Sequence, residues 1–138
     1  MRALSLIGLV CLLMACAQTG LTTEERLVLY QDYVTQNKLE PLKKITSFKF
    51  HSWRDLDNRH LIISTHISRP YFVTLKSTCV DLKWSHGIVI HNANSNTLQS
   101  KFDAISPVKF PHQKCFIDKI YKITKAQAKE IANLAKES

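Results

Sequence analysis

Glycine is scarce in this sequence, and its scarcity excludes several kinds of catalytic loop. Only three glycines occur in 138 residues. Loops that cradle phosphate groups need several glycines, because the backbone must approach the ligand closely. The chain also lacks a Gly-x-Ser-x-Gly element, so the nucleophile elbow of the α/β-hydrolases is absent. The sequence therefore indicates neither a nucleotide-binding loop nor a serine hydrolase of this class.

Closely spaced pairs of metal ligands are also missing. The chain has six histidines and four cysteines but no His-x-His, His-Glu-x-x-His or Cys-x-x-Cys. His60 and His66 share one face of an expected strand, yet about 20 Å separates them, so they cannot hold one ion together. His86 and His91 are expected on opposite faces. We predict surface histidines, no metal and no cofactor, although a site assembled across strands stays open.

No hydrophobic run is long enough to span a membrane. The apolar stretch at residues 3–14 follows the positively charged Arg2. As a helix it reaches roughly 18 Å, whereas the hydrocarbon core of a bilayer is about 30 Å thick. A short apolar run after a basic start is typical of a cleaved signal peptide. We therefore predict a signal peptide at residues 1–15.

The residues that end this run resemble the bacterial lipobox. Leu13, Met14 and Ala15 precede Cys16, as in lipoproteins whose cysteine is diacylated and becomes the new N-terminus. Two or three acyl chains give stable membrane attachment, whereas one myristoyl chain binds marginally. Ala17 rather than aspartate follows, which by resemblance to enterobacterial sorting points to the outer membrane, facing the periplasm. We expect a lipidated tether at residues 16–21 and one domain at 22–138; an ordinary secretory signal is the alternative.

Two cysteines remain once the signal peptide is removed and Cys16 carries lipid. Cys11 leaves with the signal peptide, so Cys79 and Cys115 are left in an oxidising compartment. An even number of cysteines in such a compartment indicates a disulfide. Zinc binding, with His112 close to Cys115, and free thiols are the alternatives.

The charge balance favours anionic partners. The formal net charge is +8, and loss of Arg2 leaves 18 basic and 11 acidic residues. Such an excess attracts phospholipid headgroups, lipopolysaccharide phosphates or acidic polymers. Nucleic acid fits the charge but not the expected compartment. The basic residues are dispersed along the chain, which suits either solvated faces or one basic face.

The expected secondary structure is mainly β with a helix at each end. Capping boxes at Thr22–Glu25 and Thr124–Gln127 predict a helix running to about Asn37 and a second, closing helix. Alternating or β-branched runs predict strands at residues 45–53, 61–67, 71–77, 87–91, 98–102 and 115–123, with a hairpin turn at 55–60. We predict an α+β domain, an antiparallel meander or small barrel of about five to six strands.

The order of these elements resembles a known family. The motifs are SFKFHSW, DLDNRHLII, YFVTLKSTCVDL, KFDAISP and CFIDKIYKITKAQ, and the resemblance extends over about residues 45–127. They resemble the bacterial lipoproteins grouped as domain of unknown function 6491 (DUF6491). The matching positions are Trp53, Asp57, Tyr71, Cys79, Leu82, Asp103, Ile105, Cys115, Ile117 and Ile120. The resemblance implies a lipoprotein with paired cysteines and a small β-rich domain, and it supplies no catalytic residue.

Three carboxylates are candidates for a catalytic role. Asp55 and Asp57 suit acid–base work, but they lie in the expected hairpin turn, where aspartate bonds its own backbone. Asp103 lies between apolar residues, where an aspartate most often accepts backbone N–H groups at a bend. Buried with a raised pKa, it would instead be a candidate acid.

These observations favour a non-enzymatic envelope lipoprotein that is held at the outer membrane by Cys16. It would bind a protein or an anionic envelope component. The alternatives are an inhibitor of a cell-wall hydrolase and a hydrolase that uses Asp103 or Asp57 with a nearby histidine. A pocket that joins one of these aspartates to His60, His86 or His91 would favour the enzyme. The sequence does not predict the oligomeric state.

We predict that the mature chain begins at an acylated Cys16, because the lipobox directs both modification and cleavage there. Mass spectrometry of membrane-extracted protein should find this modified N-terminus. An unmodified N-terminus at another residue would contradict the prediction.

Overall fold

The computed structural model describes residues 20–136, so the expected signal peptide and Cys16 lie outside the described residues. Within this range are two helices, α1 (Thr23–Gln36) and α2 (Lys125–Lys136). The strands between them are β1 (Pro41–Leu42), β2 (Lys44–Thr46), β3 (Ser52–Asp55), β4 (His60–Ser64), β5 (Pro70–Leu75), β6 (Ile88–His91), β7 (Thr97–Gln99), β8 (Ala104–Pro107) and β9 (Cys115–Lys122). Neither helix is long and apolar enough to cross a bilayer.

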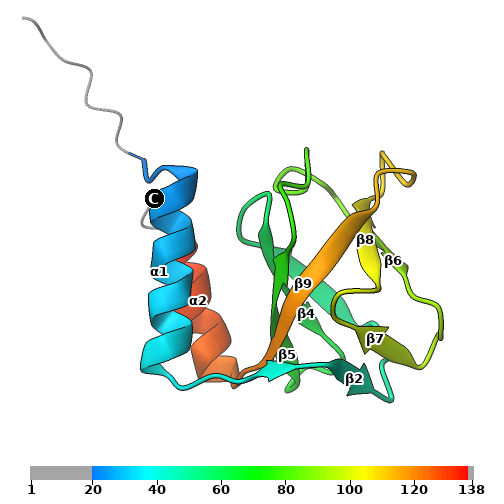
Figure 1. Cartoon of the computed structure of the whole chain (residues 1–138), viewed down its shortest axis with the longest axis horizontal. Helices are drawn as coiled ribbons and strands as arrows, with labels where there is room; N and C mark the ends of the chain where they lie inside the picture. Colours follow the sequence, from blue (N-terminus) through cyan, green and yellow to red (C-terminus); the bar gives the residue numbers. More distant parts are fainter. Residues whose placement is uncertain (1–19, 137–138) are drawn as a thin grey trace, which may run out of the picture.

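The strands form an antiparallel sheet that curls into a half-barrel. The order across the sheet is β3-β4-β5-β9-β8-β6, β1 pairs with the end of β9, and β2 pairs with β7 apart from the main sheet. Figure 1 shows the half-barrel on one side and the two helices side by side on the other. The predicted mainly β, α+β fold with a helix at each end is confirmed.

The middle of the sheet is buried on both faces. On β4 and β5, Leu61, Ile63 and Val73 point into the half-barrel. Their neighbours Ile62 and Phe72 point the other way, against the helices. Successive residues of a strand face opposite sides of the sheet, so one strand supplies both cores. A fully buried apolar side chain of this size contributes about 1.5–3 kcal/mol to stability.

Both helices begin at the predicted capping boxes. The Thr22 hydroxyl accepts the Glu25 N–H, and the Glu25 carboxylate accepts the Thr22 N–H in return. Thr124 and Gln127 exchange the same two hydrogen bonds at the start of α2. Each cap stabilises a helix by about 1 kcal/mol, so two short local motifs define where the helices start.

The strand predicted at residues 45–53 is wrong, because the chain breaks there into two strands of different sheets. Ser47 has a φ of 53°, which no extended strand tolerates. The Phe48 N–H then donates to the Asn96 carbonyl, outside either strand pairing. Before the break β2 pairs with β7, and after it β3 pairs with β4.

The sequence reading also missed β8 and misplaced its neighbour. The strand predicted at residues 98–102 is β7, which ends at Gln99. Strand β8 follows, pairs with both β6 and β9, and is buried at all four residues. Because β8 has a neighbouring strand on each edge and is buried on both faces, its four residues show no alternation of polar and apolar side chains. Its sequence is also too short to be recognised as a strand.

The predicted disulfide is confirmed. Cys79, after β5, is bonded to Cys115, the first residue of β9, with 5.7 Å between the two Cα atoms. Both cysteines belong to the core inside the half-barrel. The bond therefore fastens the long β5–β6 loop (residues 76–87) to the central strand of the sheet.

We predict that removing this disulfide lowers the free energy of unfolding by about 4 kcal/mol, because it closes a long loop in the unfolded chain. The two cysteines are 36 positions apart in sequence. Denaturant unfolding of the Cys79→Ala/Cys115→Ala variant against wild type measures the difference. Alkylation without reductant should leave both thiols unlabelled, and labelling of either would contradict the bond.

Candidate functional site

An aspartate–histidine pair occupies the β3–β4 hairpin, with His60 buried and Asp57 partly buried. Asp57 Oδ1 accepts the backbone N–H groups of Arg59 and His60, each at 2.7 Å. Both Asp57 carboxylate oxygens lie 2.9 Å from Nδ1 of His60. His60 is 2% exposed, so the expectation of surface histidines is wrong at this position. The predicted turn is present, and its aspartate also holds a histidine side chain.

Helix α1 covers this pair. The Tyr30 ring centroid lies 4.5 Å from that of His60, and the Phe72 ring stacks on the other side at 5.9 Å. A cavity of about 350 Å³ between α1 and the sheet has Tyr30, His60, Phe72 and Tyr121 among its lining residues. The structure thus brings Asp57 and a histidine together beside a cavity, as the hydrolase alternative requires.

The surroundings fix the charge states of Asp57 and Tyr30. Burial raises the pKa of the Asp57 carboxyl, but the hydrogen bonds and charge of His60 and the backbone N–H groups outweigh it. The net result is a pKa below the usual value, so Asp57 is ionised at neutral pH. Burial, reinforced by the Asp57 charge, raises the pKa of Tyr30 well above its usual value, so Tyr30 stays neutral.

The second ring nitrogen of His60, Nε2, is shielded from solvent. An ionised carboxylate only accepts hydrogen bonds, so Nδ1 of His60 carries a hydrogen that points to Asp57. Nε2 and the Tyr30 hydroxyl each expose less than 1 Å², and neither has a hydrogen-bond partner among residues 20–136. A general base must reach the proton that it removes. In this conformation the pair stabilises the hairpin and meets no substrate.

Asp103 accepts hydrogen bonds from backbone N–H groups, as predicted for an aspartate at a bend. One carboxylate oxygen accepts the Gln99 N–H at 2.6 Å, and the other accepts the Ala93 N–H at 3.4 Å. The side chain is buried and joins the turn after β7 to the loop before it. Asp103 and Asp57 thus lie in separate parts of the fold, and each is used by nearby N–H groups.

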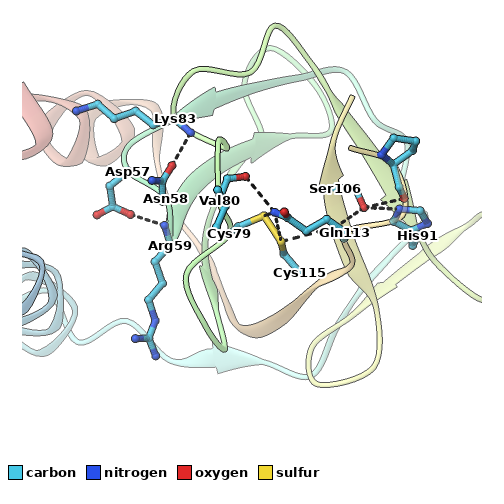
Figure 2. Close-up of a disulfide and its surroundings, with 11 residues drawn as sticks. Asp57, Asn58, Arg59, Cys79, Val80, Lys83, His91, Ser106, Gln113 and Cys115 are labelled. Atoms are coloured by element: carbon cyan, nitrogen blue, oxygen red, sulfur yellow. Dashed lines mark hydrogen bonds between the residues drawn. A yellow bond between two sulfur atoms is a disulfide. The ribbon is translucent and has the colours of Figure 1, made fainter. Parts of the chain in front are cut away.

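His91 and Ser106 form a second polar pair, visible in Figure 2. His91 Nε2 lies 2.7 Å from the Ser106 hydroxyl, which also bonds the Gln113 carbonyl at 2.7 Å. Ser106 is fully buried, so it is unavailable as a nucleophile. The pair instead attaches the β8–β9 loop (residues 108–114) to the sheet. Within the described residues, no three His, Cys, Asp or Glu side chains gather as metal ligands.

Three segments are fastened together around the disulfide (Figure 2). The Gln113 side-chain amide crosses the Cys79–Cys115 bond and donates to the Val80 carbonyl at 3.0 Å. On the other side, Asn58 in the β3–β4 hairpin accepts the Cys79 N–H and, through its side chain, the Lys83 N–H. The hairpin and the two loops therefore form one rigid end of the domain.

This end carries an exposed aromatic and basic surface, which we call the loop face. Trp84 is 76% exposed, and it lines a cavity of about 230 Å³ with Phe110 and Lys109. The Lys83 ammonium lies 5.4 Å from the centre of the Trp84 ring. The loop face consists of Val80, Lys83, Trp84, Val108, Lys109, Phe110 and Lys114. Sequence reasoning missed it, since its residues come from two loops that only the fold brings together.

Most of the family-motif positions have a structural role and do not form a binding or catalytic site. Tyr71, Leu82 and Ile117 are buried in the core inside the half-barrel, and Trp53 packs against that core. Asp57 and Asp103 hold backbone turns. None of these six side chains belongs to the loop face, so the motif specifies the architecture on which that surface is built.

We predict that Asp57→Asn lowers the free energy of unfolding at neutral pH by about 1–3 kcal/mol, because a partly buried charge-assisted hydrogen bond to His60 is lost. A depressed carboxyl pKa stabilises the fold above the unfolded pKa of about 3.9. The difference between wild type and variant should therefore disappear as the pH falls through the lower folded pKa. Denaturant unfolding across acidic pH measures it.

Asp55→Asn, two residues earlier in the same hairpin, is the matched control and should leave the acid dependence unchanged. A difference between wild type and Asp57→Asn that persists far below the unfolded pKa would show that the carboxylate charge is not what stabilises the turn.

Comparison with known proteins places the chain in a family. No curated protein and no solved structure is significantly similar to it. The model of the family of unknown function DUF6491 matches residues 1–138, the whole chain. The match agrees with the resemblance carried by the ordered motifs between Trp53 and Ile120. The chain therefore belongs to the family of unknown function DUF6491.

Proposed function

We propose that this chain is a lipid-anchored, non-enzymatic binding module of the bacterial cell envelope. Acylated Cys16 holds it at the outer membrane, and the loop face binds an anionic partner. The observation that carries the proposal is Trp84, a large aromatic side chain left 76% exposed beside Lys83 and Lys109. Aromatic side chains that stay exposed in a cluster are typical of interaction sites.

The rigidity of the loop face supports a binding role. The disulfide, the Gln113 bond to Val80 and the two Asn58 bonds hold both loops in place. A surface that is already ordered loses little conformational entropy when a partner binds. The loop face is therefore built to present its side chains in one arrangement.

The acid–base groups of the domain support the same choice. His60 Nε2 is closed off beneath α1, both oxygens of Asp103 accept backbone N–H groups, and Ser106 is buried. Each group has a role in holding the fold. None of the three presents a reactive atom to solvent in the conformation described.

A second candidate, hydrolysis with Asp57 and His60, rests on their hydrogen-bonded pairing beside the 350 Å³ cavity. It requires α1 to move away from the hairpin so that a substrate can reach Nε2. Binding through the loop face requires no such movement, and we therefore prefer it.

We predict salt-sensitive capture of anionic envelope components by the detergent-solubilised, acylated chain. Capture should weaken between about 0.1 M and 1 M salt, where the Debye length falls from about 10 Å to 3 Å. The variant Lys83→Gln/Lys109→Gln/Lys114→Gln should lose most of this capture, because it removes three positive charges from the loop face. Quantitative pull-down from an envelope extract across salt concentrations measures both effects.

A matched variant removes three exposed lysines elsewhere, in Lys43→Gln/Lys44→Gln/Lys129→Gln. It changes the net charge equally and should retain capture. Salt-independent capture would contradict the charge argument, and equal losses in both variants would contradict the assignment to the loop face.

A further inference from the structure

We propose that the partner of the loop face is the anionic phospholipid surface of the bilayer that holds the chain's own lipid anchor. This inference rests on the proposed function, because it needs the anchor at Cys16. In this arrangement the domain lies with its disulfide-bonded end on the headgroups. Trp84 and Phe110 enter the interfacial layer, and the three lysines of the loop face approach lipid phosphates.

The start of the described chain lies beside the loop face. Leu21 lines a cavity of about 250 Å³ together with Thr78 and Lys83 of the β5–β6 loop. Figure 1 shows the start of α1 at the same end of the molecule as the loops that follow β5 and β8. The described chain therefore begins next to Lys83, at the end of the molecule that carries the loop face.

The length of the tether restricts how far the bilayer can lie from this end. Cys16 is five residues before Leu21 in the sequence. A fully extended chain spans at most about 3.6 Å per residue, so the acylated cysteine lies within roughly 18 Å of Leu21. A bilayer that contains the acyl chains is thus always close to Lys83 and Trp84.

The composition of the loop face matches a membrane interface. Tryptophan concentrates at the headgroup level, where its ring is partly buried and its N–H stays hydrated. Lysines near an anionic leaflet are attracted to it, each by about a fivefold change in binding. Lys83, Lys109 and Lys114 outnumber the two acidic residues that share cavities with the loop face, Asp81 beside Trp84 and Asp57 beside Lys83. The surface is therefore both aromatic and net basic.

The opposite end of the domain provides an internal comparison. Strand β4 runs from the hairpin at His60 to the turn after Ser64, so that turn lies away from the loop face. Ile67 in this turn is 66% exposed. An aromatic reporter at Ile67 has an exposure similar to that of Trp84 but should not reach the bilayer.

The test places the acylated full chain in vesicles of phosphatidylethanolamine and phosphatidylglycerol that contain brominated lipids, which quench nearby tryptophan. The chain has two tryptophans, so Trp53→Phe leaves Trp84 as the only reporter. We expect strong quenching of Trp84, with a blue-shifted emission. The reporter Ile67→Trp, placed in a Trp53→Phe/Trp84→Phe background, should be quenched much less.

Charge dependence is the second readout. Adding Lys83→Gln/Lys109→Gln/Lys114→Gln should lower the ratio of docked to undocked domain by about a hundredfold, on the basis of fivefold per lysine. Vesicles of uncharged phosphatidylcholine should give a similar loss of quenching. The substitution Lys43→Gln/Lys44→Gln/Lys129→Gln should leave the quenching of Trp84 unchanged.

The outcomes separate the two proposals. If the chain does not float with vesicles of either composition, the anchor at Cys16 fails, and with it the basis of the inference. If the chain floats but Trp84 is quenched no more than the Ile67→Trp reporter, the anchor stands and docking of the loop face is overturned. If quenching is equal in charged and uncharged vesicles, the lysines do not drive docking and the anionic surface is not the partner.

Discussion

The fold depends on β9, because this strand is paired along both of its edges. β5 lies along one edge, while β8 and β1 share the other. Its side chains supply both cores, with Ile117 and Ile120 inside the half-barrel and Tyr121 against the helices. Ile117 and Ile120 share a face because the register of the β5–β9 pairing shifts between Ile117 and Lys119. Its first residue, Cys115, forms the disulfide. A change that shifted β9 by one residue would exchange its core side chains and move the attachment point of the β5–β6 loop.

The β3–β4 hairpin connects the sheet to the loops at the end of the domain. Asp57 fixes the turn from within, and the pair it forms with His60 lies under α1. The next residue, Asn58, bonds the β5–β6 loop on the outer side. Asp57 and Asn58, which are adjacent in the sequence, thus connect the helix layer to the loop face. Asp57 and His60, two residue types that often act in catalysis, here stabilise the hairpin.

Local rules predicted much of this fold. The two capping boxes define helix starts through residues three apart, and the turn at 55–60 is recognised from Asp and Asn alone. The Cys79–Cys115 pairing followed from compartment and count. In contrast, β8 is a strand because β6 and β9 lie on either side of it, and the break at Ser47 reflects pairing partners distant in sequence. No local pattern records either constraint.

The candidate site was harder to predict for the same reason. Lys83 and Lys109 are far apart in the sequence, and the fold places both beside Trp84. The burial of His60, in β4, depends on Tyr30, which comes from helix α1. An aspartate beside a histidine was foreseen as a possibility, but its enclosure beneath α1 follows from tertiary packing.

The disulfide gives the loop face a dependence on redox state. With reduced thiols, the β5–β6 loop would keep its hydrogen bonds to Asn58 and Gln113 but lose its covalent attachment to β9. The two loops that carry the aromatic and basic side chains would then be joined by hydrogen bonds alone. Oxidation of one pair of thiols thus adds a covalent attachment to these hydrogen bonds, so pairing of the cysteines fixes more firmly the loop that presents Trp84.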